Sequence, residues 1–177
     1  MKLRGILSLF SLLILLYSYS QEEDIPTVKI GNQEWMATNV DSAAQNSYCF
    51  GNDKLKLKKY GGLYDLQTAL KICPAGFHLP SDDEWTELTD TLGGVNVAGR
   101  KLLPGGSSNF DAPLSGNYNK DLDILSFVDK NAYFWTSTSF NTNVAWFRQL
   151  NKNQTNINRS TVDKSYFFSV RCVKDNE

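Results

Sequence analysis

The sequence predicts one α+β domain, in which strands lie toward both ends of the chain and helices gather between them. Three observations predict this class. Apolar residues repeat at helical spacing between residues 65 and 103, whereas the segments before and after carry short apolar runs separated by Asn, Asp, Gly and Ser. The order does not alternate strand with helix, and 177 residues with 41% hydrophobic and 12% aromatic residues suffice for one buried core.

The first twenty residues are typical of a secretory signal peptide. Lys2 and Arg4 precede an apolar run from Ile6 to Leu16, and the small residues Ser18 and Ser20 follow it. Because the run is too short for a hydrocarbon layer of about 30 Å, we expect cleavage after Ser20 and an exported domain of residues 21–177 without a transmembrane segment. An uncleaved membrane anchor is the open alternative.

A β-hairpin is expected where this domain begins. Residues 27–30 and 33–37 flank Gly31 and Asn32, a two-residue turn in which glycine adopts a positive φ without steric cost. Residues 41–59 have no period, and we interpret them as a solvated loop. An anion site is the alternative for the lysines of this loop, although the acidic balance of the chain opposes it. These lysines are Lys54, Lys56, Lys58 and Lys59.

The first main helix is expected over residues 66–73, with Asp65 as its N-cap and Pro74 as its stop. Apolar residues recur there at i, i+3, i+4 and i+7, which places Cys73 on the buried face. They are Leu66, Ala69, Leu70 and Cys73.

The second main helix has a stronger signal, because Ser81 and Glu84 have the spacing of a capping box. It is expected to run to residue 92, where Gly93 and Gly94 end it. Its buried face consists of Trp85, Leu88 and Leu92. A third, short helix is expected over residues 97–103, although Gly99 weakens it.

The remaining residues predict strands over 111–118, 132–138, 144–150 and 166–173. In the last of these, Cys172 alternates with Ser169 and Arg171. The alternation points Cys172 toward the core and the other two toward the opposite face.

Three cysteines are an odd number for an oxidising compartment, where disulfides are the rule. Cys73 and Cys172 lie on elements expected to be buried, so we pair them. Closing that loop removes denatured-state entropy worth at most about 4.7 kcal/mol. Cys49 is left free; it is either a small buried side chain or a functional thiol, and no basic neighbour favours the thiol.

Composition narrows the class of function. A net charge of −1 lacks the basic surface of a nucleic-acid binder. One histidine and the absence of clustered cysteines make a zinc site hard to assemble, so we expect no metal and no cofactor. A cation held by Asp121 and Asp123 is the alternative to their being solvated loop residues.

Five blocks of the sequence resemble the Fibrobacter succinogenes major paralogous domain, a family of exported bacterial proteins related to C-type lectin-like folds. The resemblance implies a twisted, largely antiparallel sheet and a location in the bacterial envelope or outside the cell. It also implies a disulfide from the first helix to the last strand, in agreement with the Cys73–Cys172 pair. The blocks are GNQEWMATN (31–39), YGGLY (60–64), CPAGFHLPS (73–81, then Glu84 and Trp85), FWTST (134–138) and residues 165–175.

The resemblance also bears on the chemistry. Calcium-dependent lectins of this fold carry Glu-Pro-Asn or Gln-Pro-Asp and Trp-Asn-Asp motifs, and this sequence has neither. The helix entry is similar to that of formylglycine-generating enzymes, but those enzymes need a close pair of active cysteines, and Cys49 stands alone. His78, beside the capping box, is expected to be structural rather than a general base.

We therefore expect a non-enzymatic recognition or surface-display module, such as an adhesin, that binds a glycan or a cell-surface protein. Aromatic rings stack on sugar faces while amides pair with hydroxyls, and the Asn-rich region 141–158 offers both. The alternative for these residues is a role in the core or in turns. An enzyme of the formylglycine-generating type and a purely structural envelope protein remain as alternative functions. The candidate ligand-binding residues are Trp146, Phe147, Arg148, Asn151, Asn153 and Asn156.

Overall fold

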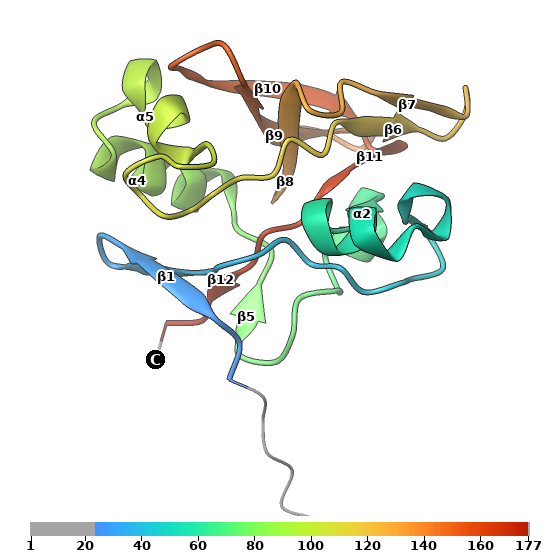
Figure 1. The fold of residues 1–177 in the computed structure, drawn as a ribbon, viewed down its shortest axis with the longest axis horizontal. Coiled ribbons are helices and arrows are strands. Elements are labelled where there is room, and N and C mark those ends of the chain that lie inside the picture. Colours follow the sequence, from blue (N-terminus) through green and yellow to red (C-terminus); the bar gives the residue numbers. More distant parts are fainter. Residues whose placement is uncertain (1–23, 177) are drawn as a thin grey trace, which may run out of the picture.

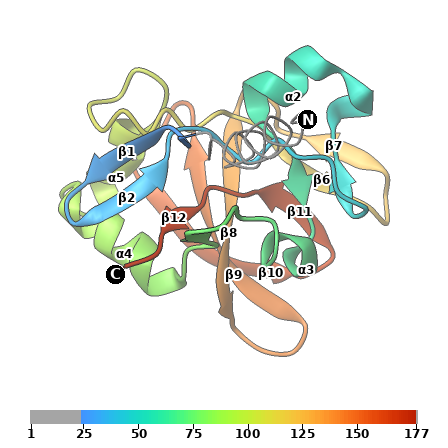
Figure 2. The ribbon, with the colours of Figure 1, turned by 90° about the horizontal axis from the view of Figure 1, so that it is seen from below.

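A computed structural model describes residues 24–176 (Figures 1 and 2). The predicted signal peptide lies outside these residues. Helices and strands mix in an α+β arrangement, as predicted, with a small sheet near the C-terminus and a larger sheet farther from it. The helices are η1 (Phe50–Asn52), α2 (Lys54–Tyr60), α3 (Leu66–Ala69), α4 (Asp82–Thr91) and α5 (Val95–Leu102). The strands are β1 (Thr27–Ile30), β2 (Gln33–Met36), β3 (Ser47–Tyr48), β4 (Leu63–Tyr64), β5 (Phe77–His78), β6 (Asn117–Asn119), β7 (Ile124–Ser126), β8 (Asn131–Ser139), β9 (Val144–Asn151), β10 (Ile157–Asp163), β11 (Tyr166–Ser169) and β12 (Val173–Lys174).

The small sheet has the order β1-β2-β12-β5 and is antiparallel throughout. The predicted hairpin β1–β2 is confirmed, and Gly31 has the expected positive φ of 61° in its turn. Strand β12, the last element of the chain, lies inside this sheet, because Val173 pairs with Trp35 on one side and His78 on the other.

The larger sheet follows the order β10-β9-β8-β11-β4-β3, and the β6–β7 hairpin attaches to β11. Long antiparallel ladders join β8 to β9 and β9 to β10. Strand β11 lies parallel to β8 and antiparallel to β4. The C-terminal segment therefore contributes an interior strand to each sheet.

Strand β8 of the larger sheet is buried on both of its faces. Ala132 and Phe134 point into a core formed with Trp85 and Leu88 of α4, whereas Tyr133 and Trp135 alternate with them and point into a second core. Figure 1 shows α4 and α5 together at one side of β8 and β9. Successive side chains of a strand point to opposite faces of the sheet. Because both faces are covered at β8, neither set of its side chains faces solvent.

The helix predictions hold in part. The capping box is confirmed: the Ser81 hydroxyl accepts a hydrogen bond from the Glu84 amide, and the Glu84 carboxylate accepts one from the Ser81 amide at 2.7 Å. The predicted short helix is α5. The helix predicted over residues 66–73 is wrong in length, because α3 ends at Ala69 and leaves Leu70 exposed and Cys73 beyond the helix.

The predicted loop over 41–59 is also wrong. It contains β3, η1 and all of α2 but its last residue, and the N-cap of α2, Asp53, accepts hydrogen bonds from the Leu55 and Lys56 amides. Tyr60, at the last position of the helix, is buried. The sequence pattern did not indicate a helix here because most of its residues are lysines that face solvent.

The strand predictions differ from the structure in three places. Residues 111–118 form a strand only near their end, as β6, and β7 and β10 were not predicted. The predicted strand over 166–173 divides into β11 and β12, which belong to different sheets. Ser169 and Arg171 are fully buried, because the segment between these strands is covered on both sides.

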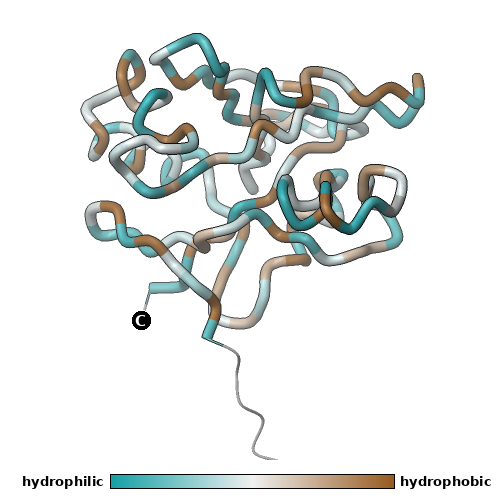
Figure 3. The backbone as a smooth tube through the Cα atoms, viewed as in Figure 1, coloured by the Kyte–Doolittle hydropathy of each residue, from teal (hydrophilic) through white to brown (hydrophobic). Residues whose placement is uncertain are grey.

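Figure 3 shows polar and apolar residues alternating along the described chain. In the stretch from residue 24 to 176, no helix is long and apolar enough to cross a bilayer.

Candidate functional site

The predicted ligand residue Trp146 is half-buried and already has aromatic and cationic neighbours. The Arg159 guanidinium lies 3.5 Å from the centre of its ring, and the Phe140 ring meets it edge-on at 5.4 Å. Because a guanidinium stacked this closely covers one face of the indole, a sugar would have to displace Arg159 before it could stack there.

Arg148, another predicted ligand residue, is 2% exposed and belongs to a buried ion cluster. Its guanidinium pairs with the Asp82 carboxylate and donates to the Asp82 carbonyl at 2.9 Å. Arg159, its cross-strand partner, also binds the Asp82 carboxylate, at 2.8 Å. Burial raises the pKa of Asp82, but hydrogen bonds from Arg159 and Arg148 outweigh burial, so the net pKa is lowered. Arg148 is therefore committed to holding α4 against the sheet.

The predicted asparagines do not join this cluster. Asn151 donates to Asn131 at 2.7 Å and accepts from the Asn153 amide at 2.9 Å, which is turn geometry. Asn153 is exposed, and Asn156 is half-buried beside α5. The structure thus distributes the six predicted residues over two sheet faces and a turn, and does not bring them together in one site.

Phe147 is buried on the other face of β9, where it lines a surface groove of about 380 Å³. We name this the aromatic groove. The β6–β7 hairpin forms one wall, and the side chains of β8 to β11 form the floor. Its lining residues are Asn117, Asn119, Leu122, Ile124, Ser126, Phe127, Tyr133, Phe147, Val162, Tyr166 and Phe168.

The groove combines aromatic rings with unpaired polar groups. Tyr133 and Phe168 stack with ring centres 5.2 Å apart at its floor. The side chains of Asn117, Ser126 and Tyr166 make no hydrogen bond to any other residue between 24 and 176. These groups can therefore pair with a ligand without breaking an internal contact. The sequence hinted at this groove only through Phe147, because its other residues come from five strands.

The disulfide prediction is confirmed: Cys73 and Cys172 are bonded, with Cα atoms 5.9 Å apart. Bonds of this kind are typical of proteins outside the cytoplasm. Cys49 is a half-buried free thiol whose Sγ lies 3.4 Å from the Ser47 hydroxyl oxygen.

His78 is held between two carboxylates. Its Nδ1 lies 2.6 Å from Asp175 and its Nε2 lies 2.8 Å from Glu84, the capping-box residue. Burial lowers the pKa of His78, but the hydrogen bonds to Asp175 and Glu84 outweigh it and raise the net pKa. Both ring nitrogens are engaged, so His78 joins the C-terminal strand to the start of α4. Within the described chain, no group of three His, Cys, Asp or Glu side chains is placed to hold a metal ion.

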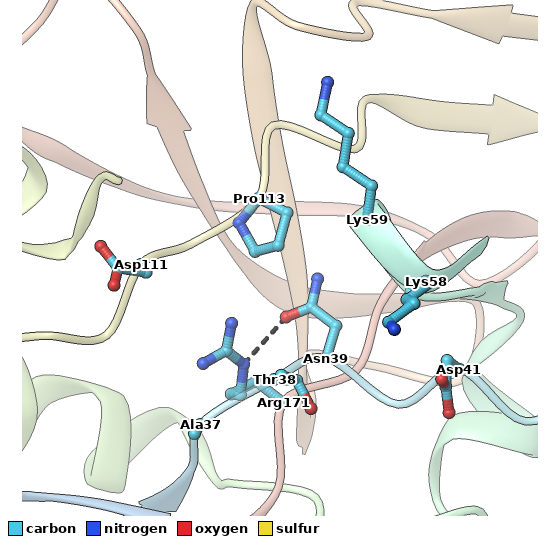
Figure 4. A pocket seen from close by; sticks show the side chains of 10 residues that line it. Ala37, Thr38, Asn39, Asp41, Lys58, Lys59, Asp111, Pro113 and Arg171 are labelled. Carbon is cyan, nitrogen blue, oxygen red and sulfur yellow. Dashed lines mark hydrogen bonds between the residues drawn. The ribbon is translucent and has the colours of Figure 1, made fainter. Parts of the chain in front are cut away.

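Arg171 is buried, like Ser169, although the sequence pattern placed both on the face opposite the core. It is 1% exposed and forms part of the wall of a cavity (Figure 4). The alternation of the last strand gave no signal for this burial.

Comparison with known protein families gives a match over most of the described chain. The model of the Fibrobacter succinogenes major domain matches residues 28–174. No curated protein matches the chain. No solved structure matches it either.

Proposed function

Because the chain belongs to the Fibrobacter succinogenes major domain family, we propose that it is an exported recognition module, without enzymatic activity, whose aromatic groove binds a neutral glycan of the cell surface. The observation that carries the proposal is the groove itself, in which aromatic rings lie beside unpaired amide and hydroxyl groups. Aromatic faces stack on the apolar faces of sugars, and amides pair with their hydroxyls.

A C-type lectin-like frame is part of the proposal. The disulfide between the segment after α3 and the residue before the last strand supports it, as does the placement of C-terminal strands in the interior of both sheets. Binding would not depend on calcium, since the sequence lacks the lectin motifs that ligate it. The engagement of Cys73 and Cys172 with each other weighs against the formylglycine-generating alternative.

The test is a glycan array followed by titration of the glycans that bind, using the chain from residue 21. Phe127→Ala removes a ring of the groove that is 53% exposed and is expected to weaken binding about tenfold, since an aromatic contact contributes roughly 0.5–1.5 kcal/mol. Phe140→Ala is the matched control, because Phe140 is 59% exposed and lies outside the groove.

A wild-type chain that binds no glycan on the array would overturn the proposal, and so would equal losses in the two variants. A structural envelope protein is the second candidate, favoured by the exposed Leu122, Ile124 and Phe127 at the groove. It predicts concentration-dependent self-association in light scattering that Phe127→Ala abolishes.

A further inference from the structure

A second cavity, of about 460 Å³, lies between segments that are far apart in the sequence. Residues from the segments 37–41, 58–61 and 111–113 line it together with Arg171, and Figure 4 shows the guanidinium of Arg171 between Asp111 and Asn39. It shares no lining residue with the aromatic groove. Its volume falls in the range of small-molecule sites, about 300–1,000 Å³.

Arg171 is fixed in this wall by its neighbours. Its Nε donates to Asn39 Oδ1 at 2.9 Å, and its Nη1 donates to the carbonyls of Met36 and Phe110 at 3.0 and 2.9 Å. The Phe110 ring lies 4.4 Å from the guanidinium. These contacts hold the planar group in one orientation, so it is preorganised for a partner.

One nitrogen of this guanidinium remains unsatisfied. Nη2 is buried and has no hydrogen-bond partner among residues 24–176, and no carboxylate of these residues forms an ion pair with Arg171. Burial lowers the pKa of Arg171 to about 9, and attraction from Asp111 opposes that shift. A buried cation with neither a hydrogen bond at one nitrogen nor an ionic partner is costly, and a ligand oxygen would remove that cost.

The charged residues around the cavity determine how many negative charges a bound ligand can carry. Lys58 and Asp41 are exposed at the rim, as is Asp111, whose Oδ1 accepts from the Gly105 amide at 2.8 Å. Lys59 already pairs with Asp129 at 3.2 Å. Because the two carboxylates lie at the rim and the cation is buried, the interior favours one negative charge, while the acidic rim repels a dianion such as phosphate.

We propose that this cavity binds the carboxylate of a small acidic molecule, about the size of one sugar or amino-acid unit, with Arg171 as the anchoring cation and Lys58 at the entrance. Because Nε and Nη1 already donate to protein oxygens, Nη2 is the nitrogen that donates to the carboxylate, in a charge-assisted hydrogen bond. The site is separate from the glycan groove and takes a ligand of different charge.

The test follows the Arg171 Nε–Hε resonance by NMR during titration with sodium glucuronate. We expect a saturable shift at about 10 mM ligand, which detects a Kd of about 1 mM or tighter, and no shift with glucose, its neutral counterpart. N-acetylalanine supplies a carboxylate without a sugar, so its affinity relative to glucuronate assigns the ligand to a sugar acid or to a peptide end.

Arg171 variants would also lose three structural hydrogen bonds, so Lys58→Glu is the informative variant. It is expected to weaken glucuronate binding about tenfold, because it replaces an attractive charge with a repulsive one. Lys54→Glu makes the same charge change on α2 outside the cavity and should leave the affinity unchanged. The proposal is overturned if neither carboxylate gives a saturable shift, if glucose or inorganic phosphate shifts the resonance as much, or if the two lysine variants behave alike.

Discussion

At the scale of single residues, the cluster of Asp82, Arg148 and Arg159 shows how the fold tolerates a like-charge pair. Arg148 and Arg159 lie directly opposite each other on β9 and β10, an arrangement that repulsion normally destabilises. The carboxylate of Asp82 lies between them and binds both. The Asp82 carboxylate thus joins α4 to the sheet and also offsets the repulsion between the two arginines.

Removing that charge should be costly. Asp82→Asn leaves two arginines facing each other without an anion, one of them buried, and we expect the free energy of unfolding to fall by about 3 kcal/mol. Urea denaturation measures the change. Asp83→Asn is the control, since Asp83 is the exposed neighbour in the same helical turn, and equal losses in both variants would contradict the role of Asp82.

The contacts of His78 predict a pH dependence of stability. A raised folded-state pKa means that the stabilisation by His78 is complete below its unfolded value of 6.5 and is lost as pH rises through the folded pKa. For Glu84, burial raises the pKa, but hydrogen bonds from Ser81 and His78 outweigh it and lower the net value, so its stabilisation is lost as pH falls below about 4.5.

We therefore expect the unfolding free energy of the wild type, minus that of His78→Gln, to decrease as the pH rises from 6.5 through the raised pKa of His78. Denaturant titrations at several pH values measure this difference. A difference that stays constant over this range would show that the imidazole charge does not contribute to stability.

At the scale of elements, α5 is set against the turn before β10 by a glycine. A Cβ at Gly99 would overlap the carbonyl oxygen of Asn156, and the Arg100 amide donates to the Thr155 carbonyl at 3.0 Å. Glycine is unfavourable in a helix by propensity, so its presence here reflects the close approach of two backbones.

This contact reverses the usual effect of alanine in a helix. Gly99→Ala should lower the unfolding free energy by about 1–3 kcal/mol through overpacking, although propensity alone would raise it. Asn96→Ala, at an exposed position of the same helix, should be neutral or slightly stabilising. Thermal unfolding compares the two, and a stabilised Gly99→Ala variant would refute the close contact.

Local signals made some elements predictable and left others hidden. The Gly31 turn and the Ser81 capping box act within a few residues, and both were read correctly. Strand β10 was missed because, as an edge strand, it carries exposed polar residues such as Asn158 and Arg159. Helix α2 had a readable cap in Asp53, but its burial at Tyr60 depends on tertiary contacts.

At the scale of the whole molecule, the candidate sites were less predictable than the fold. The aromatic groove is assembled from four strands and a hairpin, and the Arg171 cavity from two loops, the end of α2 and the segment between β11 and β12, so neither forms a motif along the chain. The predicted residues Trp146 and Arg148 carried the expected chemistry, but the sheet directs them into contacts with Arg159 and Asp82.

The disulfide is the main covalent constraint on this arrangement, with 99 positions separating its cysteines. Replacing both Cys73 and Cys172 with alanine should lower the unfolding free energy by about 2–4 kcal/mol, below the entropic ceiling of about 4.7 kcal/mol. Cys49→Ala, which breaks no covalent bond, should change it by less than about 1 kcal/mol. Equal effects of the two changes in guanidinium denaturation would count against the bridge as a stabilising link.

The interior positions of β11 and β12 affect how the protein is made. Ribosomes deliver these residues after the other strands of the domain, so the nascent domain lacks the middle of both sheets until β11 and β12 have emerged. A product truncated before residue 166 would keep hairpins and helices but expose unpaired strand edges, which makes it a substrate for quality-control proteases. Both sheets can therefore form completely only after β11 and β12 have been added to them.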